Sequence, residues 1–248
     1  MYTNHRMENY EELSMKLADI LVDTVIDKKD AVIIIATGKS PLLAYRLFAN
    51  RVKEEKIDIS KVTFIKLDEW VGLSPECNAT CEYYIRQELL KPLNIAESAY
   101  IGFDCEAKDW EAECIRIQER LDELNGIDLA VLGVGKNGHL GLNEPDDYLV
   151  MGPHLVTLDK KTKTHAMLTT ADKQVEQGVT LGIANLFAAE KIVLLVSGAE
   201  KEKAVREFHG EYISTRIPVT LLKLHKNLVC IVEKNAFPPL EEGDENEV

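Results

Sequence analysis

The sequence lacks an excess of positive charge: its 248 residues hold 29 Lys and Arg against 42 Asp and Glu, a formal net charge of −13. It has no basic cluster, which excludes nucleic acid or an anionic membrane surface as the main partner. No stretch approaches the roughly 18 unbroken apolar residues of a membrane-spanning helix. Residues 1–13, MYTNHRMENYEEL, also lack the apolar centre of a secretory signal. We therefore expect a cytoplasmic protein.

Cysteines are few and odd in number. Their scatter does not suit a disulfide framework, and they are Cys77, Cys81, Cys105, Cys114 and Cys230. Cys77 and Cys81 stand four residues apart, but no second pair and no nearby histidine accompany them. We expect these side chains to pack in the interior, and we expect no metal site.

Apolar patterning predicts an α/β fold. Short apolar runs rich in β-branched residues predict strands buried on both faces, at residues 31–36, 62–67, 128–133, 192–197 and 228–232. Helical spacing of apolar residues predicts helices at 10–26, 42–52, 81–90, 110–124, 179–189 and 200–208. This alternation indicates a doubly wound, mostly parallel sheet with helices on both faces.

The remaining segments indicate how the chain is divided. Weaker extended stretches at 155–158 and 166–170 predict a small hairpin or lid. We expect one domain over residues 1–240. The acidic tail at 241–248, with five acidic residues, is expected to be disordered.

Ligands of open α/β sheets bind beyond the carboxyl ends of the strands. The first predicted strand is followed by ATGKSP at 36–41, whose GKS resembles the end of a nucleotide-binding P-loop. The motif's first glycine would fall at Ile33 inside the strand, so that interpretation fails. Ser40 as N-cap and Pro41 at the first helical position predict a helix start that, with Lys39, binds phosphate. An ordinary strand-to-helix turn is the alternative.

Two carboxylates, Asp68 and Glu69, end the second predicted strand. A carboxylate at this place can serve as a general base. Adjacent side chains on extended backbone diverge, so at most one of the two faces a reacting group. The alternative is a solvated acidic turn.

The third predicted strand runs into GVGKNGH at 133–139, a literal G-x-G-x-x-G. Dinucleotide binding requires a helix there, and Gly141 and Pro145 disfavour one, so we reject that interpretation. The loop instead presents His139 near Glu144, whose carboxylate would fix the histidine tautomer. A structural histidine is the alternative. Lys201, after the fourth strand, could reach a phosphate opposite Lys39 or could simply be solvated.

Taken together, these segments resemble the glucosamine-6-phosphate and galactosamine-6-phosphate deaminases, also called aminosugar-phosphate isomerases. The match runs in order over most of the chain, through residues 36–41, 67–73, 133–145, 180–183 and 197–201. The blocks D-E-x-V-G-L and G-H-x-x-x-N-E-P are specific in combination. The resemblance implies conversion of an amino-aldose 6-phosphate to a ketose 6-phosphate and ammonia, without an organic cofactor or a catalytic metal.

The resemblance also implies roles for individual residues. Asp68 would be the base that moves a proton from C2 to C1, and His139, oriented by Glu144, would open the sugar ring. Asn137 would belong to the same catalytic group. Phosphate and substrate binding would fall to Thr37, Gly38, Lys39, Ser40, Gly138 and Lys201, with Glu69 supporting the site.

Three departures from the glucosamine-6-phosphate enzymes favour the galactosamine-6-phosphate branch, whose product would be tagatose 6-phosphate. Asn137 stands where those enzymes have aspartate, which removes a charge beside His139. Lys39 replaces a second glycine. The family's phosphate-binding arginine has no evident counterpart, and KKTKTH at 160–165 offers lysines and a histidine instead. Glucosamine 6-phosphate stays open as the substrate.

Two other functions remain as alternatives. A 6-phosphogluconolactonase-type hydrolase resembles the chain less, because its loop continues with serine, leucine and phenylalanine where this one has NEP at 143–145. A non-catalytic sugar-phosphate sensor would need an attached DNA-binding helix pair, for which we expect no room. We expect a small-molecule aminosugar phosphate as the partner, with no nucleic acid and no membrane. The sequence leaves oligomeric state, a homo-oligomer included, and allosteric control open.

Overall fold

A seven-stranded sheet forms the centre of the structure, a computed structural model that describes residues 2–236. Every strand pairing in it is parallel. The spatial order is β1 (Thr3–Met7), β10 (Leu228–Glu233), β9 (Ala189–Val196), β6 (Ile127–Gly133), β2 (Val32–Ile35), β3 (Thr63–Lys66) and β5 (Tyr100–Ile101). The predicted mostly parallel sheet is confirmed.

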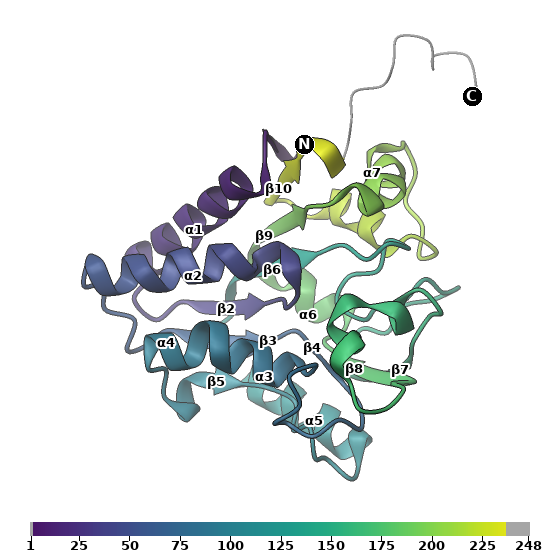
Figure 1. The fold of residues 1–248 in the computed structure, drawn as a ribbon, viewed down its shortest axis with the longest axis horizontal. Coiled ribbons are helices and arrows are strands. Elements are labelled where there is room, and N and C mark those ends of the chain that lie inside the picture. The colour runs from purple at the N-terminus through teal and green to yellow at the C-terminus, as the bar shows by residue number, and fades with distance from the viewer. Residues whose placement is uncertain (1, 237–248) are drawn as a thin grey trace.

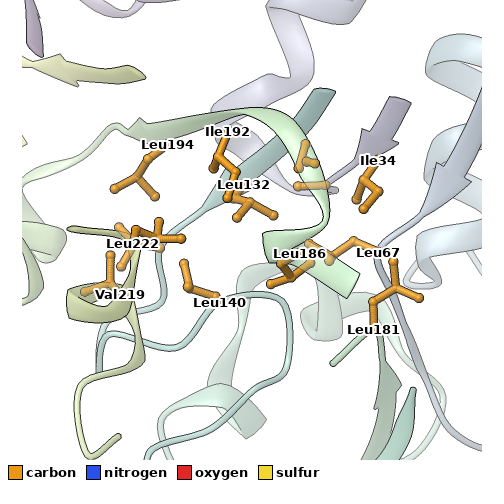
Figure 2. Packing of buried hydrophobic residues seen from close by; sticks show 14 of the residues in the cluster. Ile34, Leu67, Leu132, Leu140, Leu181, Leu186, Ile192, Leu194, Val219 and Leu222 are labelled. Carbon is orange, nitrogen blue, oxygen red and sulfur yellow. The ribbon is translucent and has the colours of Figure 1, made fainter. Parts of the chain in front are cut away.

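Helices cover both faces of this sheet (Figure 1). They are α1 (Tyr10–Asp27), α2 (Lys39–Glu54), α3 (Cys81–Ile85), α4 (Lys91–Leu93), α5 (Trp110–Asp122), α6 (Ile183–Phe187) and α7 (Glu202–His209), with a π-helix at Arg86–Leu90. Alternation along β2 separates the faces: Ile33 and Ile35 join the apolar cluster under α1 and α2, whereas Ile34 joins the cluster under α5, α6 and α7. Figure 2 shows the second cluster, where Ile34 lies near Leu186 and Leu67.

A small antiparallel sheet, in the order β4 (Asp68–Trp70), β8 (Gln177–Thr180) and β7 (His154–Thr157), lies beside the main one. The extended stretch predicted at 155–158 corresponds to β7, but its partner is β8. The prediction of an extended stretch at 166–170 is wrong. Ala166–Thr170 forms a 3-10 helix held by local bonds, in which the N–H of Leu168 donates to the carbonyl of His165.

Two predicted helices begin elsewhere. The helix predicted at 179–189 is wrong at both ends, because Thr180 pairs with Asp68 in the small sheet and Ala189 already belongs to β9. Helix α2 begins at Lys39 with Gly38 as its N-cap, so Ser40 is not the cap. A positive φ of 101° at Gly38 makes the turn, a conformation that favours glycine.

The sequence patterns missed the short strands β1, β4 and β5. Strand β1 pairs only with β10 at the sheet edge and is largely exposed, so it carries no apolar run. The predicted acidic tail at 241–248 lies outside the described residues. No helix among residues 2–236 is both long and apolar enough to cross a membrane.

Candidate active site

A cleft of about 520 Å³ opens at the carboxyl edge of the main sheet. Its walls come from the segments that follow β2, β3, β6 and β9, together with the segment 161–167. The chain passes from β2 to β3 on one side, while β6 pairs with β2 on the other. The cleft therefore lies at the reversal of strand order, where ligands of open α/β sheets bind.

The turn into α2 forms one wall, which includes Thr37, Gly38, Lys39 and Ser40. No side chain caps this helix. The hydroxyl of Tyr84 donates to the carbonyl of Gly38 at 2.9 Å and holds the turn in place. A 16-residue helix that begins uncapped at a cleft wall offers its N–H groups and positive dipole end to an anion.

Asp68 faces the same cleft from the start of β4, two residues after β3 ends. The residue is 9% exposed. Burial, and then the neighbouring Glu69 carboxylate, raise the pKa of Asp68 to about 6. A carboxylate with this pKa can accept and return a proton near neutral pH.

Glu69 points away from the cleft and is fully buried. One carboxylate oxygen accepts from the backbone N–H of Trp70 at 2.8 Å and of Cys81 at 2.9 Å. The other accepts from the N–H of Glu82 at 2.8 Å and from Nζ of Lys66 at 2.9 Å. Glu69 thus joins β4 to α3 and does not form part of the cleft wall.

Within residues 2–236, one group has the spacing of metal ligands, namely Glu69, Glu82 and Cys105. Nζ of Lys66 lies 2.9, 2.7 and 3.9 Å from these three side chains. The lysine ammonium therefore fills the position that a bound cation would take.

The loop after β6 presents His139 to the cleft. Nδ1 of His139 lies 3.1 Å from Oε2 of Glu144, and Nδ2 of Asn137 donates to the same oxygen at 2.8 Å. Burial raises the pKa of Glu144, but hydrogen bonds from His139, Thr162 and Asn137 outweigh it and lower that pKa overall. An ionised Glu144 only accepts hydrogen bonds, so Nδ1 carries the proton and Nε2 is the nitrogen left for a ligand.

Glycines shape this loop. A Cβ on Gly135 would overlap the imidazole of His139, so only glycine leaves room for the ring. Gly138 has a φ of 88°, and its carbonyl accepts from the N–H of Val219 at 2.8 Å. Gly138 shapes the loop from behind and does not line the cleft.

Gly135→Ala is expected to lower kcat by roughly 10- to 100-fold, because a displaced imidazole loses its alignment. Steady-state kinetics of the variant would measure the loss. Gly152→Ala is the matched control, since a Cβ there meets only Oε1 of Gln118 at 3.4 Å and lies outside the cleft. Equal activities of the two variants would contradict the positioning of His139 by Gly135.

Cationic side chains also line the cleft. They are the lysines Lys136, Lys161 and Lys201. Burial lowers the pKa of Lys201, the nearby Glu200 raises it, and Lys136 lowers it further. These lysines share the cleft with the start of α2 and concentrate positive charge within an acidic protein.

His165 belongs to the same region. Its ring lies 5.8 Å from that of Trp70, and its Nδ1 accepts from the N–H of Met167 at 3.3 Å. Burial, and then the nearby Lys201, lower the pKa of His165 to about 4. His165 is therefore neutral near pH 7, with its proton on Nε2, where it can donate to a ligand.

The structure brings most of the predicted site residues to one cleft. Eight of them line it: Thr37, Gly38, Lys39, Ser40, Asp68, Asn137, His139 and Lys201. The other three do not line it: Glu144 contacts the His139 imidazole, and Glu69 and Gly138 also lie outside the cleft lining. The sequence patterns missed Trp70, Tyr84, Lys136 and Thr162. Lys136 lies inside the GVGKNGH segment, where a signal was present, whereas Tyr84 comes from a helix with no motif.

Known proteins resemble the chain along most of its length. Residues 5–230 match the family described as glucosamine-6-phosphate isomerases/6-phosphogluconolactonase. The chain is 40% identical over 230 residues to "Putative deaminase AgaI" of Escherichia coli (strain K12), covering 93% of this chain and 91% of that protein. It is 38% identical to glucosamine-6-phosphate deaminase of Halothermothrix orenii (strain H 168), covering 92% and 96%.

Solved structures agree. A monomeric glucosamine-6-phosphate deaminase superposes with a TM-score of 0.90 at 31% identity, covering 94% of this chain and 98% of that one. The 6-phosphogluconolactonase of Leishmania guyanensis reaches a TM-score of 0.73 at 19% identity, covering 95% and 97%, and this likeness shows the fold alone. The family resemblance of the motifs is thereby confirmed. The chain belongs to the family of glucosamine-6-phosphate isomerases and 6-phosphogluconolactonases.

Proposed function

We propose that the protein is an aminosugar-phosphate deaminase that converts an amino-aldose 6-phosphate to the ketose 6-phosphate and ammonia. One observation carries the proposal: Asp68 and the His139–Glu144 pair share a single cleft with the uncapped start of α2 and Lys201. This cleft combines a proton acceptor, an oriented imidazole and an anion site. The deaminase names of the relatives support the same activity.

Substrate binding begins at the phosphate. The N–H groups at the start of α2 and the ammonium of Lys201 hold it from two sides, and Nε2 of His165 adds a neutral donor. Anchoring the 6-phosphate fixes C1 and C2 relative to Asp68, so proton transfer occurs at contact distance. Glu69 supports this arrangement by holding the backbone next to Asp68.

Ring opening comes first in the proposed reaction. Nε2 of His139 takes the proton of the C1 hydroxyl and passes it to the ring oxygen as the bond between C1 and that oxygen breaks, while Glu144 holds the imidazole in orientation. The open-chain aldehyde then carries its amino group on C2. Asp68 removes the C2 proton to give an enolamine, and returning that proton to C1 gives a C2 imine. Water hydrolyses this imine to the ketone and releases ammonia.

The reaction requires an ionised Asp68, and its raised pKa fixes the pH dependence. With a pKa of about 6, the carboxylate is protonated as the pH falls below that value. We expect kcat/KM to drop about tenfold per pH unit below pH ~6. Ammonia release measured from pH 5 to pH 8 would reveal this decrease, which is the acid limb of the kcat/KM profile. A rate that stays constant down to pH 5 would contradict Asp68 as the base.

Lys201→Ala is expected to raise KM by roughly 10- to 100-fold with little change in kcat, because a hydrogen bond between charged groups is lost. Lys203→Ala is the matched control, since that lysine is exposed in the first turn of α7, two residues after Lys201, and does not line the cleft. An unaltered KM in Lys201→Ala would remove this lysine from the phosphate site.

Within this proposal we favour galactosamine 6-phosphate as the substrate and tagatose 6-phosphate as the product. The supporting features are Asn137 beside Glu144, Lys39 in the phosphate turn and the segment 160–165, which places Lys161 and His165 at the cleft. Ammonia release should be measured in parallel from galactosamine 6-phosphate and glucosamine 6-phosphate. We expect the higher kcat/KM with the galactosamine substrate. The reverse order would leave the deaminase proposal standing and overturn the choice of sugar.

A further inference from the structure

Cys81 begins α3 and is buried at 1% exposure. Its Sγ lies 3.5 Å from Oδ1 of Asp68 and 3.2 Å from Oγ1 of Thr37. The backbone N–H of Cys81 donates to the Glu69 carboxylate at 2.9 Å. Since Glu69 follows Asp68 in the chain, this bond holds Cys81 close to Asp68. One thiol therefore contacts a residue of the phosphate turn and the Asp68 carboxylate at the start of β4.

The direction of these hydrogen bonds follows from charge. Burial, and then the carboxylates of Glu69 and Asp68, raise the pKa of Cys81 well above its ordinary value, so the thiol keeps its proton. An ionised carboxylate can only accept, so the S–H donates to Asp68 and the Thr37 hydroxyl is left to donate to sulfur. The two bonds form a chain from Thr37 through Cys81 to Asp68.

We propose that Cys81 is a positioning residue for Asp68: its thiol donates a hydrogen bond to Oδ1, holds the carboxylate in its orientation toward the cleft, and stabilises the ionised form. The inference rests on the proposed function for the role of Asp68. It does not make the thiol a nucleophile, because the sulfur stays protonated and buried.

Other groups also act on Asp68 and would persist in a Cys81 variant. Besides burial, they are the charged or titratable groups of Glu69, His139, Lys66 and Tyr45. Glu69 favours the protonated carboxylate, whereas His139 and Lys66 favour the ionised one. Removing only the Cys81 thiol therefore shifts the protonation equilibrium of Asp68 toward the protonated carboxyl, and it removes no charged group.

Cys81→Ala is expected to move the acid limb of the kcat/KM profile up by about 0.5 to 1 pH unit, which is a loss of about 3- to 10-fold below the limb. Cys81→Ser keeps a donor of nearly the same size and should keep the wild-type limb. Cys230→Ala is the matched control, because Cys230 is fully buried in β10 and does not line the cleft. Its limb should not move.

A pH limb that stays unchanged in Cys81→Ala, or activity that falls equally at every pH in both Cys81 variants, would overturn the proposal. The S–H stretching band in the infrared spectrum tests it without turnover. In the wild type, the Cys81 band, assigned by its loss in Cys81→Ser, should shift as Asp68 titrates, and it should not shift in Asp68→Asn. A band that does not respond to pH would also overturn the role of Cys81. Absence of ammonia release from any aminosugar phosphate by the wild type would instead refute the proposed function.

Discussion

Asp68→Asn is expected to lower kcat for ketose formation by about 10²- to 10⁴-fold, the usual contribution of a general base. The amide has nearly the same shape and can still accept a hydrogen bond from Cys81, whose sulfur lies 3.5 Å from Oδ1. It cannot take a proton from C2. The phosphate contacts at the start of α2 and at Lys201 are untouched, so KM should change little. Steady-state kinetics together with substrate binding to the variant would separate the two effects.

Asp122→Asn serves as the control for this variant, because Asp122 is exposed at the end of α5, where it accepts a hydrogen bond from Gln118, and does not line the cleft. Near-normal turnover in Asp68→Asn would refute the base assignment. A loss of binding equal to the loss of kcat/KM would place Asp68 in substrate binding and not in proton transfer.

Lys66→Met is expected to destabilise the fold by about 3–5 kcal/mol, the usual cost of leaving a buried charge without its partner. Lys66 is 1% exposed and donates to Glu69 at 2.9 Å, to Glu82 at 2.7 Å and to the carbonyl of Phe103 at 2.9 Å. Burial lowers the pKa of Lys66, but the surrounding anions and Tyr100 outweigh it and hold that pKa well above its ordinary value. Methionine fills a similar volume but leaves two buried carboxylates without their shared cation.

Urea unfolding would measure this loss, with Lys53→Met, at an exposed position of α2, as the control. A destabilisation below about 1 kcal/mol would contradict the ion network as a structural support. Adding Glu69→Gln to Lys66→Met should recover part of the stability, because the buried Glu69 charge disappears while Glu82 keeps its ion pair with Arg86 at 2.7 Å. This recovery separates the charge effect from a simple packing defect.

The sequence predicted much of the candidate site because its main residues lie close to strand ends. Asp68 and His139 each follow a continuous apolar run, and parallel strands bring their carboxyl ends to one edge. Tyr84 and His165 reach the cleft from segments without a strand-end signal, so only tertiary structure places them. The contact of Cys81 with Asp68 joins the start of α3 to the start of β4, and no spacing rule predicts it.

The incorrect predictions of secondary structure have a common physical cause. Residues 179–180 carry apolar spacing that suits a helix, but pairing with β4 and β7 makes them a strand. Residues 166–170 are rich in residues tolerated in strands, yet no described strand pairs with them, and local hydrogen bonds close a 3-10 helix. In both cases the neighbours in space decided the structure, and a single sequence does not contain them.

The most direct test is the product balance of the wild-type enzyme with galactosamine 6-phosphate and glucosamine 6-phosphate. We predict that one of these substrates yields ammonia and ketose 6-phosphate in equal amounts, and that Asp68→Asn forms neither product at a comparable rate. Hydrolysis of 6-phosphogluconolactone, without ammonia release from either aminosugar phosphate, would contradict the deaminase proposal.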